Sequence, residues 1–392
     1  MTSGARHPAV SFLILAAILS SSIFMFVRTP HELQRAHGLA LIGAIVVFVG
    51  WFRHPDKGIG GVIPAFALIL FVSYRGWAFH QLSNGESTYD YHLLYADRGF
   101  GFDPSLVAYK LVERFGLFPL MSVVYESLCL CLGLCYAAQI GSKQKAGRVF
   151  ALLALPAILG PLCYKLLPAC GPVWLLGSPC YTGEIPASCA NVTFNSLRQI
   201  HLDRAWPRNA IPSMHLAWAL LIWWTSREMR YGRWFSLAFV FGTVLATLGG
   251  GEHYLVDLVA AFPFSLVVWS FCMGDVPLHH PRRMLPLAGS GAALLLWIAC
   301  VRFRPQLFSV SPMVTWAAAT CIVAGTLLVL SRCWPVSAQH ETSVIGTLKV
   351  ADAFPAISLF DGSQDSLVIH EDGLAAAGQR RKRALTPTRR VF

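Results

Sequence analysis

The sequence predicts an all-α, polytopic membrane protein with about ten transmembrane helices. Hydrophobic residues make up 55% of the 392 residues and charged residues only 13%, which is typical of a chain that lies mostly in a bilayer. The apolar residues form runs that approach or exceed the length of a bilayer span. The net charge of +11 is scattered through the loops, which argues against nucleic-acid binding and indicates membrane orientation and contact with anionic lipid.

The predicted spans fall into three groups. Two extra helices occupy 1–60, and the first has no small-residue cleavage pattern, so we interpret it as a retained helix rather than a signal peptide. Six spans form a core at 61–275, and two more follow within 276–335. The ten spans are 9–27, 38–52, 61–77, 116–140, 149–170, 211–226, 233–249, 254–274, 285–301 and 314–331.

The end of the chain changes character. Residues 336–392 are mostly polar, mixed in charge, and contain basic clusters at 380–383 and 389–390. Such a composition predicts a largely disordered tail that can touch acidic lipid headgroups.

Cysteines are numerous, but most of the eleven lie in or beside apolar runs, where they act as small core residues. Cys180 and Cys189, in the longest polar loop of the middle region, are the pair placed to form a disulfide. Whether they are bridged stays open at this point.

Basic residues in the loops predict the orientation. The loops at 141–148 and 227–233 are short and dense in lysine and arginine, whereas the long loops at 78–115 and 171–210 are dilute in positive charge. Because basic loops tend to stay in the cytoplasm, both termini are predicted to be cytoplasmic and both long loops external.

Two histidines lie at equivalent ends of apolar segments, 38 residues apart. His215 opens one predicted helix and His253 precedes another, so an antiparallel helix pair between them would let the two face each other. Asp257 follows His253 by four residues on the same helical face. A histidine with an orienting carboxylate, beside a second histidine at a helix start rich in free N–H groups, suits phosphoryl chemistry. The predicted topology places this site at the external face.

Polar residues near that face are candidates for holding phosphate. Lys165 lies near the external end of span 149–170, where an ammonium needs a partner or a function unless it extends to the headgroups. Arg208 is the basic residue nearest to the first histidine motif. The predicted phosphate-binding residues are Lys165, Arg208, Ser213 and Arg204.

Several motifs are similar to those of a known family. Pro-Ser-x-His at 212–215 and His-Tyr-x-x-Asp at 253–257 resemble the second and third signature motifs of the type 2 phosphatidic acid phosphatase superfamily. The Tyr-x-x-x-Pro-x-x-Gly-Pro run at 164–172 stands where that superfamily has its first motif. The segment 247–251 is closer to the inositol phosphorylceramide synthase (inositolphosphotransferase) branch, and 89–104, with Asp97 and Asp103, resembles an external segment of its bacterial members.

The sequence departs from the superfamily pattern in two places. After Lys165 the first motif has Gly171-Pro172 instead of Arg-Pro, and the third has Ala246-Thr247 instead of Ser-Arg. Two phosphate-holding arginines are therefore missing. Either the substrate is a phosphodiester that needs less charge neutralisation, or other arginines replace them. The candidates are Arg208, Arg204 and Arg198.

The residue types and the resemblance together imply a mechanism. His253, held in one tautomer by Asp257, attacks phosphorus and forms a phosphohistidine. His215 protonates the departing alkoxide and then takes a proton from the incoming alcohol or water. This chemistry needs no metal or other cofactor. The lipid would enter sideways from the outer leaflet.

The favoured reaction is transfer of a phosphoryl or phospho-headgroup from a membrane lipid to an alcohol, such as a ceramide-like acceptor. The alternatives are hydrolysis of a lipid phosphomonoester or diphosphate, and a non-catalytic transporter or scaffold. Two histidines and an aspartate suit zinc or iron as well, with His201 and Asp203 as the only supplement. For Glu126, inside span 116–140, we expect a hydrogen bond between helices.

Overall fold

The computed structural model of the chain describes residues 31–53, 87–140, 143–176, 193, 197–202, 207–274 and 276–333. All of them belong to the unit 1–335, one of two into which the chain divides. The predicted spans 9–27 and 61–77 lie outside the described residues, as does the predicted tail 336–392. Cys180, Cys189, Asp203 and Arg204 also lie outside them.

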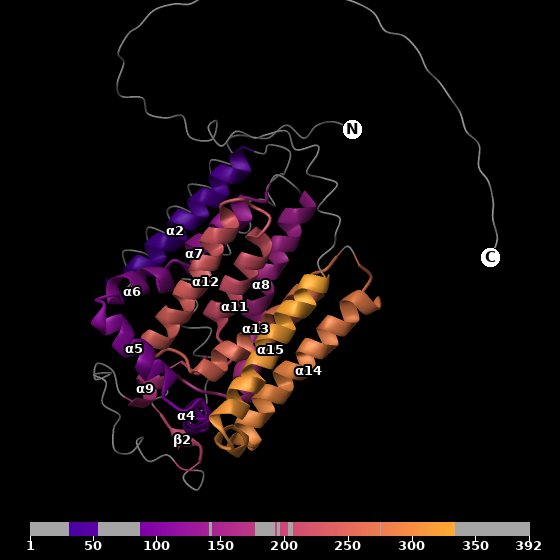
Figure 1. Cartoon of the computed structure of the whole chain (residues 1–392). Helices are drawn as coiled ribbons and strands as arrows, with labels where there is room; N and C mark the ends of the chain where they lie inside the picture. The colour runs from indigo at the N-terminus through magenta and orange to yellow at the C-terminus, as the bar shows by residue number, and fades with distance from the viewer. Residues whose placement is uncertain are drawn as a thin grey trace, which may run out of the picture. The chain divides into compact units, whose positions relative to one another are not determined.

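The described chain is helical apart from two short strands, which confirms the predicted all-α class (Figure 1). The first elements are α2 (His31–Phe52), β1 (Ser87–Thr88), α4 (Asp90–Arg98), α5 (Pro104–Arg114), α6 (Phe118–Glu126), α7 (Leu128–Ala137), α8 (Lys143–Leu166) and α9 (Pro172–Leu176). They are followed by β2 (Ile200–His201), α11 (Met214–Ser226), α12 (Gly232–Gly249), α13 (Leu255–Phe271), α14 (Pro281–Phe303), the 3-10 helix η4 (Pro305–Ser309) and α15 (Pro312–Cys333). The strands pair antiparallel, with Ser87 opposite His201 and Thr88 opposite Ile200.

Within these residues, five helices are long and apolar enough to cross a membrane, namely α2, α8, α12, α14 and α15. The bent pair α6 and α7 makes a sixth if it counts as one span. The chain is therefore an integral membrane protein with several transmembrane helices.

The predicted span 116–140 is a broken helix rather than a continuous one. Helices α6 and α7 meet at Ser127 with a bend of 48°. The Ser127 hydroxyl donates a 2.8 Å hydrogen bond to the carbonyl of Val124. Such side-chain bonds to the preceding turn compete with the helical backbone and are a known cause of bending.

Several predicted boundaries were wrong. Helix α8 begins at Lys143, so most of the expected basic loop 141–148 is helical, and the expected loop 78–115 contains α4 and α5. Helix α11 has 13 residues, which gives a length of about 20 Å and is short for a full span. It begins late because Ser213 caps it by accepting the N–H of Leu216 at 3.5 Å.

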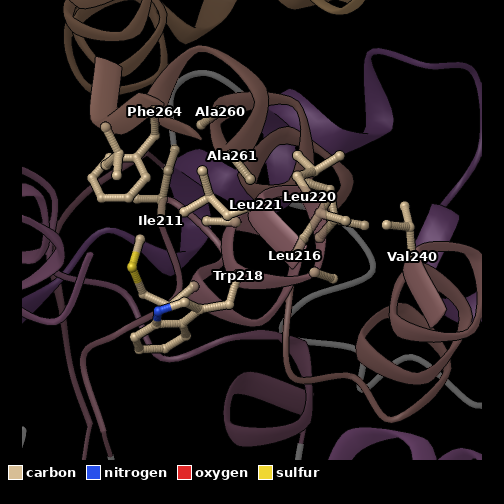
Figure 2. Close-up of a cluster of buried hydrophobic side chains, with 14 of the residues drawn as sticks. Ile211, Leu216, Trp218, Leu220, Leu221, Val240, Ala260, Ala261 and Phe264 are labelled. Carbon is tan, nitrogen blue, oxygen red and sulfur yellow. The ribbon is translucent and has the colours of Figure 1, made fainter. Parts of the chain in front are cut away.

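The core is built around α11, which packs against α7, α8, α12 and α13. Most of its side chains are buried, unlike those of a helix that faces lipid on one side. Figure 2 shows Leu216, Leu220 and Leu221 of α11 in one cluster with apolar residues of neighbouring segments. The other labelled members are Ile211, Trp218, Val240, Ala260, Ala261 and Phe264. Both histidine motifs lie at the N-terminal ends of the helices α11 and α13 of this core.

Candidate active site

Four segments far apart in the sequence meet at the N-terminal ends of α11 and α13. The N–H of Ala210 donates to the carbonyl of Ala169 at 3.0 Å, which joins the second motif to the first. The N–H of Val173 donates to the carbonyl of Gly251 at 2.8 Å, which joins the first motif to the third. The N–H of Tyr89 donates to the carbonyl of Pro168 at 2.8 Å and brings in the segment before α4.

Gly171 shows how tightly these segments are packed. Its φ is +112°, a conformation that favours glycine, and a Cβ at this position would lie 2.3 Å from the carbonyl oxygen of Glu252. Glycine is therefore required for the first motif to touch the third. This also gives a structural reason for the Gly-Pro that stands where the superfamily has Arg-Pro.

His253 is the more enclosed of the two predicted catalytic histidines, with 3% of its surface exposed. Its Nδ1 lies 2.9 Å from the carbonyl oxygen of Ala210 and, because a carbonyl only accepts, Nδ1 carries the proton and Nε2 holds the free electron pair. Burial lowers the pKa of His253 to about 4, although Glu252 and the Ala210 carbonyl act in the opposite direction. The imidazole is therefore neutral at pH 7.

Asp257 is fully buried one turn further along, at the start of α13. Its Oδ2 is 3.6 Å from Nδ1 of His253, beyond a normal hydrogen bond, and accepts the N–H of Tyr254 at 2.8 Å. The backbone N–H of Ser213 donates to the Asp257 carbonyl at 3.2 Å, which holds the start of α11 against α13. The carbonyl of Ala210, rather than Asp257, therefore makes the hydrogen bond that sets the tautomer, and Asp257 adds a nearby carboxylate.

Two further carboxylates, Asp90 and Asp97 of α4, hold this arrangement from outside the motifs. Asp90 accepts the N–H groups of Cys170 and Gly171 at 2.9 to 3.1 Å and the hydroxyl of Tyr254 at 3.0 Å. Asp97 accepts the N–H groups of Leu255 and Val256 at 3.0 and 2.9 Å, and so caps α13 from another helix.

Burial raises the pKa of both carboxyl groups, and the N–H groups they bind act against this rise. Sequence reasoning singled out Asp97 by resemblance alone and missed Asp90. No local spacing connects Asp90 to Cys170, Gly171 and Tyr254, which lie 80 or more positions away. The sequence signal that could have identified Asp90 was the presence of an aspartate in a chain with few charged residues.

His215 lies in a different environment, at the second position of α11, and is only partly buried. Its ring stacks on the ring of Tyr125 in α6, with centroids 3.9 Å apart and planes inclined by 21°. The segments that carry His215 and His253 adjoin through the contacts of Ala210 and Ser213 described above. That the two imidazoles face each other stays a prediction.

The predicted phosphate-binding residues have different positions. The guanidinium of Arg208 is buried, donates to the carbonyl of Leu202 at 2.9 Å, and lies near Cys170 of the first motif. Ser213 is buried and acts as the α11 cap. Arg198 is exposed, and Arg204 lies outside the described residues.

Lys165 does not point into this cluster. It is exposed on the face of α8 that also presents Ile158, Leu162 and Leu166, which are 65%, 58% and 42% exposed. Its neighbour Tyr164 is buried and lies within electrostatic range of Asp257 and Tyr125. In a membrane helix such an apolar exposed face meets lipid, so the ammonium is placed to extend toward the headgroups.

The arrangement of the described side chains does not add support to the alternative hypothesis of a metal site. Among the described residues, no group of three or more histidine, cysteine, aspartate or glutamate side chains is arranged to hold a metal ion. His201, the proposed supplement, is exposed in β2.

The fold and site thus define a helical membrane protein with a buried histidine–carboxylate centre at one end of its helices. Residues 91–271 match the family model described as the PAP2 superfamily. The match covers less than half of the chain; it supports the resemblance of this region to the type 2 phosphatidic acid phosphatase superfamily and, in general, a phosphatase-type activity on lipid phosphates. The match leaves out α2, α14 and α15. Neither the curated proteins nor the solved structures compared with the chain gave a match.

Proposed function

We propose that the protein is a membrane phosphotransferase of the inositolphosphotransferase type, which moves a phosphoryl or phospho-headgroup from a lipid to an alcohol through a phosphohistidine. The observation that carries the proposal is the convergence of the three motifs around a buried, neutral His253. Its Nε2 has the free electron pair that a nucleophile needs, and no proton has to be removed before it attacks.

Arg208 is the proposed phosphate-binding cation. An arginine presents several N–H donors in a planar fork, and its attraction for a phosphoryl oxygen is strengthened where water is excluded. It occupies the region of the first and second motifs, where it can replace the arginine that the first motif lacks. Ser213 and the N–H groups at the start of α11 complete the proposed phosphate site. Lys165 is left for contact with lipid headgroups.

Burial favours transfer over hydrolysis. His253 is 3% exposed and Asp257 fully buried, so a phosphohistidine formed there is shielded from water. An alcohol that enters from the lipid side would then react before water does. Hydrolysis, the reaction of the phosphatases of the superfamily, is the competing outcome.

The test is an assay of the purified full-length protein in vesicles with headgroup-labelled phospholipids, with and without an acceptor such as ceramide or diacylglycerol. Label on the acceptor lipid supports transfer, whereas a water-soluble labelled product that forms regardless of acceptor identifies a hydrolase. His253→Ala should abolish either activity. The matched control is His279→Ala, an exposed histidine between α13 and α14. A folded wild-type protein without turnover or phosphoenzyme would contradict a catalytic role.

We also propose that the site is extracytoplasmic. The basic residues that predicted the orientation lie at the opposite helix ends from the histidines: Arg148 near the start of α8 stacks over Trp269 near the end of α13, and Arg283 of α14 donates to the Ser270 carbonyl. A single cysteine introduced within 197–202, with Cys180 and Cys189 replaced, should react with an impermeant maleimide in intact cells. Reaction only after permeabilisation would reverse the orientation.

A further inference from the structure

Among the described residues, the stack between Tyr125 and His215 has no counterpart at His253. Two rings with centroids 3.9 Å apart and planes only 21° from parallel are in direct face contact, which restricts rotation of the imidazole. Tyr125 is partly buried and packs with Val112, Met121 and Ala246, so its own ring is held from behind. This contact therefore fixes His215 in a way that its place at a helix start does not.

The stack also bears on the charge of His215. A cation at the N-terminal end of a helix is disfavoured by the helix dipole, and His215 is the second residue of α11. An aromatic face attracts a cation, so contact with the ring of Tyr125 opposes that effect whenever the imidazole carries the proton. A general acid needs that protonated form.

The bend that carries Tyr125 is itself anchored by a polar cluster. Glu126 forms an ion pair with Arg35 of α2 at 3.4 Å, and Ser122 donates to Glu126 at 3.1 Å while accepting from Arg35 at 3.1 Å. A hydrogen bond between helices was expected for Glu126; its hydrogen bond is instead to Ser122 of the same helix, and its contact with α2 is the ion pair with Arg35. The cluster lies one residue from the break at Ser127, so α2, which is outside the region matched by the family, supports the segment that positions His215.

We propose that Tyr125 is a positioning residue for His215, held by the Arg35–Glu126 pair, and that it sets the efficiency with which His215 protonates the leaving group. The proposal rests on the proposed function, in which His215 is the general acid. It predicts that losing the ring harms substrates with poor leaving groups and spares those that leave without a proton.

The experiment compares turnover of a natural phospholipid and of a nitrophenyl phosphodiester by the full-length enzyme. Tyr125→Leu should lower turnover of the phospholipid relative to the activated ester by about 3- to 10-fold, the scale expected for an aromatic pair. Tyr125→Phe keeps a ring on the imidazole, so its ratio should stay near that of the wild type. Phe118→Leu is the control. It removes an aromatic ring from the same helix, α6, but the ring of Phe118 contacts Tyr109 and not His215.

Glu126→Gln tests the support from α2. It leaves an amide that can still bond Ser122 but removes the charge that pairs with Arg35, whose side chain is 56% exposed. The ratio should move in the same direction as in Tyr125→Leu, by less, about 2-fold, since exposed ion pairs contribute little. An unchanged ratio here would remove α2 from the proposal.

The outcomes separate the two proposals. An inactive wild-type protein overturns the proposed function. An active wild type in which Tyr125→Leu loses both substrates equally, or neither, overturns only the positioning role, because a general structural effect does not discriminate between leaving groups.

Discussion

The two histidines of the site have nearly opposite environments. His253 is enclosed, hydrogen-bonded through Nδ1 to the Ala210 carbonyl, and has a pKa lowered to about 4 by burial. His215 is partly exposed and has the aromatic face of Tyr125 against its ring. One environment favours a neutral imidazole of fixed tautomer, and the other a ring that can accept a proton.

This difference supports the proposed roles of the two histidines on physical grounds. A nucleophile that becomes phosphorylated has to be neutral with a defined free nitrogen, which describes His253. An acid and base has to change protonation state during each turnover, which a buried group with a strongly shifted pKa does poorly at neutral pH. The assignment of His253 as nucleophile and His215 as acid therefore agrees with the environments of both residues.

The largest expected effect is that of His253→Ala. Without its imidazole no group is placed to hold the phosphoryl group, so both turnover and the acid-labile phosphoenzyme should disappear. The measurement is a trapping experiment with labelled lipid, followed by acid and base stability of the protein-bound label. Label that persists in His253→Ala and is lost in His215→Ala would reverse the two roles.

The effect of His215→Ala on turnover should be smaller than that of His253→Ala and should depend on the leaving group of the substrate. On a natural lipid, loss of the general acid should cost about 10²- to 10⁴-fold, the usual range for proton transfer by a side chain. A nitrophenyl ester leaves without protonation, so much of the first step should survive and be visible as a burst of nitrophenol. Equal losses of turnover on both substrates would mean that His215 is not a general acid distinct from the nucleophile.

Parts of this site could be predicted from sequence because they depend on local spacing. His253 and Asp257 are four residues apart, which places them on one helical face, and Ser213 directly precedes an apolar helix. An antiparallel helix pair between the motifs returns the chain to the end where it started. These spacings predict that the second and third motifs lie near each other. The hydrogen bond to the Ala210 carbonyl could not be predicted, since every residue has a carbonyl. Asp90 was missed because Cys170, Gly171 and Tyr254 lie 80 or more positions away, and Tyr125 because His215 lies 90 positions away.

The prediction for Lys165 and the predicted transmembrane spans also depended on information that the sequence does not contain. Lys165 was predicted to bind phosphate because of its depth in the membrane. The depth of a residue does not determine which side of its helix it lies on. Its neighbours at the helical spacing, Ile158 and Leu162, are exposed and apolar, so the face that it shares is the one suited to lipid. Hydropathy likewise located the segment 116–140 but could not locate the bend, which depends on a single serine hydroxyl.

Asp257→Asn should have an intermediate effect. The same oxygen, Oδ2, accepts from Tyr254 and approaches Nδ1 of His253, so the amide oxygen of an asparagine can take its place. With the Ala210 carbonyl still fixing the tautomer, the loss in kcat should be well below the roughly 10⁴-fold caused by the equivalent change in the Ser-His-Asp triad. Steady-state rates on the natural lipid test this, and a loss as large as in the triad would show that the carboxylate sets the tautomer after all.

The smallest expected effect is that of mild acid on the activated ester. His253 has to be neutral to attack, and its pKa lies below the ordinary value, so the neutral form persists as the pH falls through 6.5 and is lost only near pH 4. A nitrophenyl phosphodiester has no ionisation of its own in this range and needs no acid from His215, so kcat/KM should stay nearly flat from pH 7 to 5. The phospholipid serves as the control, because its turnover also needs a proton from the general acid. An acid limb near pH 6.5 on the activated ester would mean that the nucleophile is not enclosed as described.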